Sequence, residues 1–221
     1  MKYLVTRPLE QSLDLKEKLE KEGHEIFCLP LIEIRPPEDG GLLLKSVLNQ
    51  LSQYDWLLVT SQHAVWALQP HIPVWPLGLR VAASGPKTAL ELKKIGCSAF
   101  FPQEDFGASG LVAFFKQQNI GGKRILYPRS KIGRKDWIAE LEKMGAQVDL
   151  VEAYRTVRTN VTAYDLFCLL GKGIEAVLFF SPSAVDHFFT LVQPKDPRIQ
   201  NIAFVPVGPT TARALKKWNA D

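Results

Sequence analysis

Long apolar runs and a cysteine framework are both missing from this chain of 221 residues. No apolar stretch approaches the roughly 18 residues that a membrane-spanning helix needs. Met1-Lys2 leads directly into a short strand pattern rather than into the apolar core of a signal peptide. The three cysteines are widely spaced in apolar surroundings, which argues against disulfides or a zinc site: Cys28, Cys97 and Cys168. These absences predict a cytoplasmic protein with no membrane contact.

Signatures of common catalytic and cofactor sites are also missing. There is no Gly-x-Ser-x-Gly elbow, the hexapeptide 85–90 is no phosphate-binding loop, and no Gly-x-Gly-x-x-Gly follows the first strand. The histidines do not have the spacing of metal ligands: His24, His63, His71 and His187. Acidic residues on the predicted helices are typical of solvated faces: Glu17, Glu20, Asp136 and Glu140. We therefore expect no metal, no cofactor and no pair of catalytic carboxylates.

Charge is modest and evenly spread. The chain has 27 Lys and Arg against 23 Asp and Glu, a formal net charge of +4, and the basic residues form no block. A hydrophobic content of 46% is ordinary for a globular protein. This balance favours an anionic small molecule over nucleic acid as the binding partner.

What the chain does contain is an internal repeat with an offset of about 122 residues. The first strand, its helix and the stop at Gly23 return in the second half, where the stop is Gly145, and 145 minus 23 is 122. Two later motifs recur in the same order: Val59-Thr60-Ser61 as Phe179-Phe180-Ser181, and Ala83-Ser84-Gly85-Pro86-Lys87-Thr88-Ala89 as Pro206-Val207-Gly208-Pro209-Thr210-Thr211-Ala212. A duplication of this length indicates two similar domains, which commonly hold a ligand between them.

Short apolar runs alternate with amphipathic segments, which is typical of parallel sheets covered by helices. The predicted strands are 3–6, 25–31, 56–60, 80–84, 98–101, 124–127, 147–151, 176–180 and 202–207, and the predicted helices are 9–22, 88–95, 110–119, 134–144 and 210–218. The fold class is α/β, with two flavodoxin-like parallel-sheet domains. The second half has no equivalent of residues 98–121, so we expect its domain to lack an edge strand and helix.

The repeats need not coincide with the domains. Residues 29–37 and 151–157 occupy equivalent repeat positions and extend their strands beyond the length that a domain needs, and Pro36-Pro37 favours an extended exit. If the chain crosses between domains at these two-stranded linkers, one domain comprises 1–35 with 157–221 and the other comprises 37–153.

Small, hydroxylic or basic residues follow most of the predicted strands. In open α/β sheets ligands bind at these carboxyl ends, and helix N-termini with nearby Arg or Lys favour anions. The candidate substrate-binding residues are Arg7, Ser61, Lys87, Thr88, Arg129, Ser181, Ser183, Thr210, Thr211 and Arg213. Each Ser or Thr has a purely structural alternative as a helix cap, and each following proline is at the favoured first helical position.

Tyr154 lies on a linker rather than in a core element. A buried tyrosine whose hydroxyl is satisfied is one interpretation. A general acid at the ligand site is the other.

Together these motifs resemble the uroporphyrinogen-III synthase family over essentially the whole chain. The resemblance rests on Thr6-Arg7-Pro8, Pro30-Leu31-Ile32-Glu33-Ile34, Thr60-Ser61, Gly85-Pro86-Lys87-Thr88-Ala89, Val151-Glu152-Ala153-Tyr154-Arg155-Thr156, Phe179-Phe180-Ser181-Pro182-Ser183-Ala184-Val185 and Val207-Gly208-Pro209-Thr210-Thr211-Ala212.

The resemblance implies two α/β domains joined by a two-stranded ladder, and a cofactor-independent lyase. Such an enzyme closes hydroxymethylbilane, a substrate with eight carboxylates, while inverting its terminal pyrrole ring. It implies that Tyr154 is the acid and that Ser61, Thr88, Ser181, Ser183 and Thr211 are the hydroxylic turn residues. Arg7, Lys87, Arg129 and Arg213 are our own candidates for the carboxylates. Because members of the family continue through another strand and helix after the last helix found here, reduced substrate affinity or stability is expected.

Three possibilities stay open. The chain is the enzyme, a non-enzymatic two-domain module that senses an anionic small molecule, or a pseudoenzyme. A monomer is expected in each case.

Overall fold

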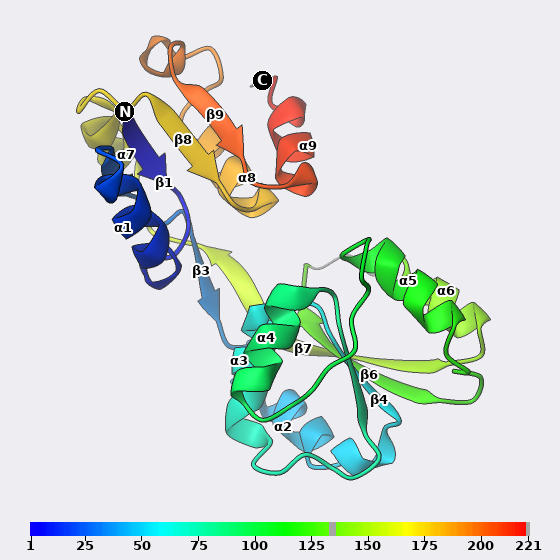
Figure 1. The fold of residues 1–221 in the computed structure, drawn as a ribbon. Helices are drawn as coiled ribbons and strands as arrows, with labels where there is room; N and C mark the ends of the chain where they lie inside the picture. The colour runs from blue at the N-terminus through cyan, green and yellow to red at the C-terminus, as the bar shows by residue number, and fades with distance from the viewer. Residues whose placement is uncertain (133–135, 220–221) are drawn as a thin grey trace. The chain divides into compact units, whose positions relative to one another are not determined.

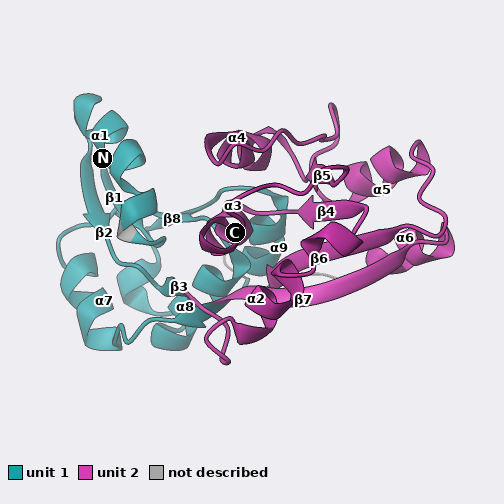
Figure 2. Cartoon of the chain, turned by 90° about the horizontal axis from the view of Figure 1, so that it is seen from below, with its two compact units in different colours: residues 1–33, 156–221 teal, residues 34–155 magenta. Residues whose placement is uncertain are grey.

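Strands and helices alternate through two compact units in a computed structural model, which describes residues 1–132 and 136–219. Unit 1 comprises residues 1–33 and 156–221, and unit 2 comprises residues 34–155 (Figure 2). Part of the predicted helix 134–144 lies outside the described residues, because residues 133–135 are not among them. Unit 1 contains the start and the end of the sequence, so each unit contains strands from both copies of the repeat (Figure 1).

Unit 1 contains a 4-stranded sheet in the order β2-β1-β8-β9, and its neighbouring strands are parallel. Its strands are β1 (Lys2–Val5), β2 (Glu25–Cys28), β8 (Ala176–Phe179) and β9 (Ala203–Pro206). Its helices are α1 (Leu13–Lys21), α7 (Ala163–Leu170), α8 (Pro182–Leu191) and α9 (Pro209–Lys217), with short 3-10 turns at Leu9–Gln11 and Pro197–Ile199. This is the flavodoxin-like order 2-1-3-4 without a fifth strand.

The two faces of the unit 1 sheet are covered unequally. Helices α7, α8 and α9 pack on one face, where aromatic side chains form a buried cluster around Phe188, which is 0% exposed. Its ring contacts those of Phe179, Phe189 and Phe204 at centroid distances of 5.3, 5.2 and 5.7 Å. The other face has a smaller cluster against α1. Val205, on β9, is 39% exposed.

Unit 2 is built on a 5-stranded sheet in the order β3-β7-β6-β4-β5. Its strands are β3 (Ile32–Arg35), β4 (Trp56–Val59), β5 (Arg80–Ala83), β6 (Arg124–Ser130) and β7 (Gln147–Arg158). Its helices are α2 (Leu42–Leu48), α3 (Gln62–Leu68), α4 (Pro86–Lys94), α5 (Ala108–Lys116) and α6 (Ile138–Lys143), with 3-10 turns at Leu51–Gln53 and Gln69–His71. Helices α2, α3 and α4 cover one face, and α5 and α6 cover the other.

Strands β3 and β7 are the two segments in which the chain passes from one unit to the other, and they are neighbours in the sheet order. On the unit 1 side, Thr159 Oγ1 donates to the carbonyl of Pro30 at 2.7 Å, and its N–H donates to that of Leu31 at 3.2 Å. On the unit 2 side, Arg155 Nε donates to the carbonyl of Pro36 at 3.1 Å. Hydrogen bonds thus anchor the segments beside both crossings.

The repeat seen in the sequence is also present in the strand register. Tyr3 pairs with Ala176 in unit 1, and Ile125 pairs with Trp56 in unit 2. The two central-strand residues, Tyr3 and Ile125, are 122 positions apart, and their partners, Trp56 and Ala176, are 120 positions apart, so both distances match the repeat offset. By the same register Arg7 of unit 1 corresponds to Arg129 of unit 2.

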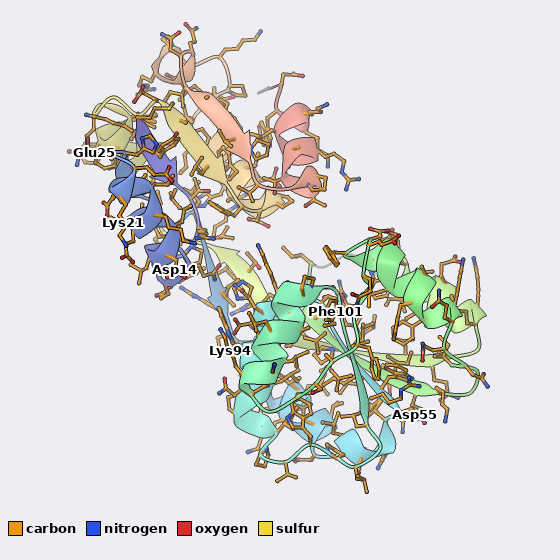
Figure 3. The ribbon with its side chains drawn as sticks, in the orientation of Figure 1. Asp14, Lys21, Glu25, Asp55, Lys94 and Phe101 are labelled. Atoms are coloured by element: carbon orange, nitrogen blue, oxygen red, sulfur yellow. The ribbon has the colours of Figure 1, made fainter. Side chains whose placement is uncertain are left out.

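An acidic residue fixes this register at the start of both sheets. Asp55, labelled in Figure 3, accepts the N–H of Arg124 on Oδ2 at 2.9 Å, and its own N–H donates to the carbonyl of Arg124 at 2.9 Å. Glu175 repeats this arrangement with Lys2, at 2.7 Å for the side-chain bond and 2.9 Å for the backbone bond. The N–H and the carbonyl of the first residue in each central strand are therefore both hydrogen-bonded to the same acidic residue.

The predicted strand at 98–101 is wrong. Only Phe100 pairs with β5, accepting from the N–H of Ala83 at 2.7 Å and donating to the carbonyl of Val81 at 2.8 Å. Pro102 has no N–H with which to continue the ladder. The segment is a single bridge at the edge of the sheet.

Helix boundaries also differ from the predictions. Helices α4 and α9 begin at their prolines, Pro86 and Pro209, and the first predicted helix divides into a 3-10 turn and α1. Four further helices were not predicted: α2, α3, α7 and α8. No helix in the described part of the chain is long and apolar enough to cross a membrane.

We predict that the two cores can be weakened separately. Phe188→Ala in unit 1 and Phe115→Ala in unit 2 each remove a fully buried ring, at an expected cost of about 3–5 kcal/mol. Hydrogen exchange followed by mass spectrometry should show faster exchange in the unit that carries the substitution. Phe106→Ala is the control, because Phe106 is 55% exposed. Equal acceleration in both units by either core variant would contradict separate cores.

Candidate functional site

Ser61 and Tyr154 meet at the carboxyl edge of the unit 2 sheet. Ser61 follows β4 and caps α3 in an extended conformation, with φ −152° and ψ 153°. Its Oγ accepts the N–H of Ala64 at 3.2 Å and lies 2.8 Å from the hydroxyl of Tyr154. The residues are 93 positions apart, and the sheet order brings them together because β7 and β4 flank β6.

Tyr154 is half-buried, and its environment favours the protonated hydroxyl. Burial raises the pKa of Tyr154, while the hydrogen bond with Ser61 acts in the opposite direction. Tyr127 adds to the increase, and the positive charge of Arg129 opposes it. Tyr154 is therefore a neutral donor at neutral pH, with a nearby cation and a hydroxyl that can stabilise its anion.

Tyr127 forms a second tyrosine pair beside the first. Its hydroxyl lies 3.1 Å from Thr60 Oγ1, and the carbonyl of Thr60 accepts a hydrogen bond from Ser84 Oγ at 3.0 Å. Burial raises the pKa of Tyr127, against the hydrogen bond with Thr60 and the charge of Arg129. Tyr127 was not among the residues predicted to act at the site. The available signal was its position at the end of the predicted strand 124–127, two residues before Arg129.

Arg129 is a cation close to both tyrosines. Within the part of the chain that the structure describes, its buried Nε has no hydrogen-bond partner. A guanidinium is a fork of donors suited to carboxylates. Ser61, Tyr154 and Arg129 are thus the predicted residues that unit 2 brings together.

A cavity of about 300 Å³ lies next to Tyr154, within unit 2. Its lining comes from β3 and the turn after it, the start of α2, the α3 region and β7: Ile34, Arg35, Pro36, Pro37, Gly40, Gly41, Leu44, His63, Trp66, Ala67, Pro70, His71, Ala153 and Tyr154. The ring of His63 is 5.4 Å from that of Tyr154 and 5.1 Å from that of Trp66. Burial lowers the pKa of His63, and its buried Nδ1 has no partner among the described residues.

The remaining unit 2 candidates lie on α4. Lys87 is exposed, whereas Thr88 is buried in the helix at 6% exposure. The cap residue Gly85 lies under Phe106, because a Cβ on this glycine would be 3.3 Å from that ring. The close approach of Phe106 therefore favours a residue without a Cβ at the start of α4.

Unit 1 repeats the arrangement without a tyrosine pair. Arg7 follows β1, its guanidinium lies 4.3 Å from the Phe180 ring, and burial lowers the pKa of this arginine. Its buried Nε has no partner among the described residues, as for Arg129. Ser181 caps α8 by accepting the N–H of Ala184 at 3.2 Å. The other candidates are Ser183, which is half-buried, Thr211, which is buried, and Thr210 and Arg213, which are exposed.

The geometry supports proton donation by Tyr154 and anion binding at the two equivalent arginines. No group of three or more His, Cys, Asp or Glu suited to a metal occurs in the residues that the structure describes.

Comparison with known proteins gives one consistent family. The family model described as uroporphyrinogen-III synthase HemD matches residues 14–221. The uroporphyrinogen-III synthase of Synechococcus elongatus is 29% identical, over 95% of this chain and 83% of the relative. That of Proteus mirabilis is 32% identical over 70% of this chain and 80% of the relative.

A solved structure shares the fold. A mutant uroporphyrinogen III synthase from Thermus thermophilus matches with a TM-score of 0.67 and 19% identity, covering 100% of this chain and 90% of that one. The two-domain α/β architecture predicted from the sequence is therefore confirmed.

We predict that His63 makes stability depend on pH. The pKa of His63 is lower in the folded state than in the unfolded chain, where it is about 6.5, so the unfolded chain binds a proton more readily. The free energy of unfolding is therefore unaffected by His63 above this pH and decreases as the pH falls below it. His63→Phe keeps a ring against Tyr154 and Trp66 but removes this titration. Urea unfolding at neutral and mildly acidic pH should show a smaller loss in the variant. Equal losses in both proteins would refute the assignment.

Proposed function

The chain belongs to the uroporphyrinogen-III synthase family, and we propose that Tyr154 is the acid of its reaction. The reaction closes linear hydroxymethylbilane into a macrocycle, with loss of water and inversion of the terminal pyrrole ring. The observation that carries the proposal is the half-buried Tyr154 hydroxyl, 2.8 Å from Ser61 Oγ at the carboxyl edge of the sheet.

The acid acts on the terminal hydroxyl of the substrate. Tyr154 gives its proton to this oxygen, the carbon–oxygen bond breaks with both electrons going to oxygen, and water leaves. The lone pair of the pyrrole nitrogen stabilises the electron-deficient carbon by donating electrons through the ring. The substituted carbon of the terminal ring attacks this carbon, the bond from the substituted carbon to its original methylene bridge then breaks, and the bridge re-forms at the free position of the same ring. Loss of the proton from that position restores the pyrrole, and the proton returns to the tyrosinate. The sum is hydroxymethylbilane to product plus water, with the tyrosine regenerated.

Positioning is the second contribution. Hydroxymethylbilane closes without help to the unrearranged type I isomer, so the protein must direct attack to the substituted carbon of the terminal ring. Arg7 and Arg129 are suited to hold substrate carboxylates, because both carry buried, unpartnered Nε atoms at equivalent strand ends. The other proposed contacts are Ser61, Lys87, Thr88, Ser181, Ser183, Thr210, Thr211 and Arg213.

We further propose that units 1 and 2 act as the two domains of the enzyme, in the cytoplasm and as a monomer. The division of the fold at residues 33/34 and 155/156 supports the domains. The free thiols of Cys28, Cys97 and Cys168 support a reducing compartment. Light scattering on the purified protein measures the oligomeric state.

Tyr154→Phe tests the acid. The variant keeps the ring and loses the proton donor, so formation of the type III isomer should fall by about 10²- to 10⁴-fold. The measurement uses freshly generated hydroxymethylbilane and separates the type I and type III products. Tyr54→Phe is the control, since Tyr54 donates to Asp149 Oδ2 at 2.8 Å, at the start of the sheet.

Two outcomes would overturn parts of this proposal. Undiminished type III product from Tyr154→Phe would remove Tyr154 from the mechanism. A wild-type protein that forms only the type I isomer would instead favour a binding module or a pseudoenzyme.

Arg7→Gln and Arg129→Gln test carboxylate binding. Each variant loses hydrogen bonds to a charged group, so KM should rise by about 10- to 100-fold with a smaller change in kcat. Lys143→Gln is the control, because Lys143 is exposed and paired with Glu140 on α6. An unchanged KM in both arginine variants would place the carboxylates elsewhere.

A further inference from the structure

Ser61 and Ser181 form the same helix cap in the two copies of the repeat. Their backbone angles are −152° and 153° for Ser61 and −152° and 152° for Ser181, and each accepts an N–H three residues later at 3.2 Å. Of the two, and among the residues that the structure describes, only Ser61 has a tyrosine hydroxyl beside it, at 2.8 Å. Within the described residues, Ser181 Oγ makes no hydrogen bond to another side chain. One cap thus carries an additional contact that helix capping does not require.

We propose that Ser61 is a positioning residue for Tyr154, which it stabilises as the tyrosinate formed when the proton passes to the leaving hydroxyl. This inference rests on the proposed role of Tyr154 as the acid. It replaces substrate binding as the main task of Ser61. The hydroxyl does not touch the reacting carbon and acts through the tyrosine oxygen.

The direction of the hydrogen bond follows from what each atom can do. The N–H of Ala64 already donates to Ser61 Oγ, so the serine proton is free to point elsewhere. A tyrosinate can only accept, so after proton transfer the 2.8 Å contact persists only with Ser61 as the donor. The bond from Ala64 also polarises the serine hydroxyl, and a bond to an anion is stronger than one between neutral groups.

Other titratable and charged groups around Tyr154 come from α3, β6, β3 and the 3-10 turn Gln69–His71, whose His71 lines the cavity next to Tyr154. His63 lies against its ring, Arg129 favours the anion, and Tyr127 disfavours it. Arg35 lines the same cavity. Because all of these remain in a Ser61 variant, a change in Tyr154 ionisation can be assigned to the serine.

The test measures Tyr154 ionisation directly, without substrate. The protein is labelled with 3-fluorotyrosine, which ionises at lower pH than tyrosine, and the five tyrosines are followed by fluorine NMR during a pH titration. Tyr154→Phe identifies the resonance. We expect Ser61→Ala to raise the pKa of this tyrosine and to lower kcat for the type III isomer about 10- to 100-fold.

Three further variants separate this role from capping. Ser181→Ala loses the equivalent cap and should lower thermal stability as much as Ser61→Ala, with no change in the Tyr154 titration. Ser61→Thr keeps both cap and hydroxyl, so it should restore the titration. Ser61→Asp keeps a good cap but offers a carboxylate that only accepts, so it should raise the pKa further and lower kcat while stability is retained.

The outcomes distinguish the two proposals. If Ser61→Ala leaves the Tyr154 titration unchanged, Ser61 does not stabilise the tyrosinate and this inference fails, whatever the activity. If the titration shifts as expected but Tyr154→Phe retains full activity, the contact is real and the role of Tyr154 as the acid fails instead.

Discussion

The register of the two central strands is the constraint on which the rest of the structure depends. Asp55 in unit 2 and Glu175 in unit 1 each hold the first peptide of a central strand through a carboxylate and a backbone hydrogen bond. With the start fixed and the pairing parallel, the positions of the later residues on β1 and β6 follow as far as Arg129, after which the register of β6 with β7 shifts. This is why Arg7 and Arg129, on different halves of the chain, arrive at equivalent strand ends with the same unpartnered Nε.

The same scaffold carries different chemistry in the two units. Both units place a serine cap after a strand that neighbours the central one, Ser181 after β8 and Ser61 after β4, and in unit 2 the extension of β7 to Arg158 brings a tyrosine beside the cap. That extension is also the segment by which the chain leaves the unit. The same strand, β7, therefore both connects the two units and supplies Tyr154. Among the described residues, Ser181 has no tyrosine hydroxyl beside it.

The sequence predicted well what is local or periodic, and poorly what depends on distant pairing. The repeat, most strands and the α/β class follow from apolar periodicity and recurring turn residues, which short segments encode by themselves. The prediction of a strand at 98–101 was wrong, because apolar content does not reveal whether the segment pairs with the neighbouring strand β5 at more than the single position Phe100. Tyr154 was singled out by its position on a linker, but its contact with Ser61 was not foreseen, since the two residues are 93 positions apart. Tyr127 was missed because its run reads as core until Thr60 is placed beside its hydroxyl.

A tyrosine that serves as an acid must satisfy two opposing requirements, and the surroundings of Tyr154 address each with a different interaction. It must keep its proton until substrate arrives, as a tyrosine does at neutral pH, and burial raises its pKa further. It must also tolerate the charge that remains after transfer, and burial alone would make that charge costly. The Ser61 hydroxyl and the Arg129 charge both favour the anion, and both are held by elements of one unit. A donor fixed before the reaction needs no reorganisation when the charge appears, so in the proposed mechanism the helix cap that positions Ser61 lowers the cost of proton transfer from Tyr154.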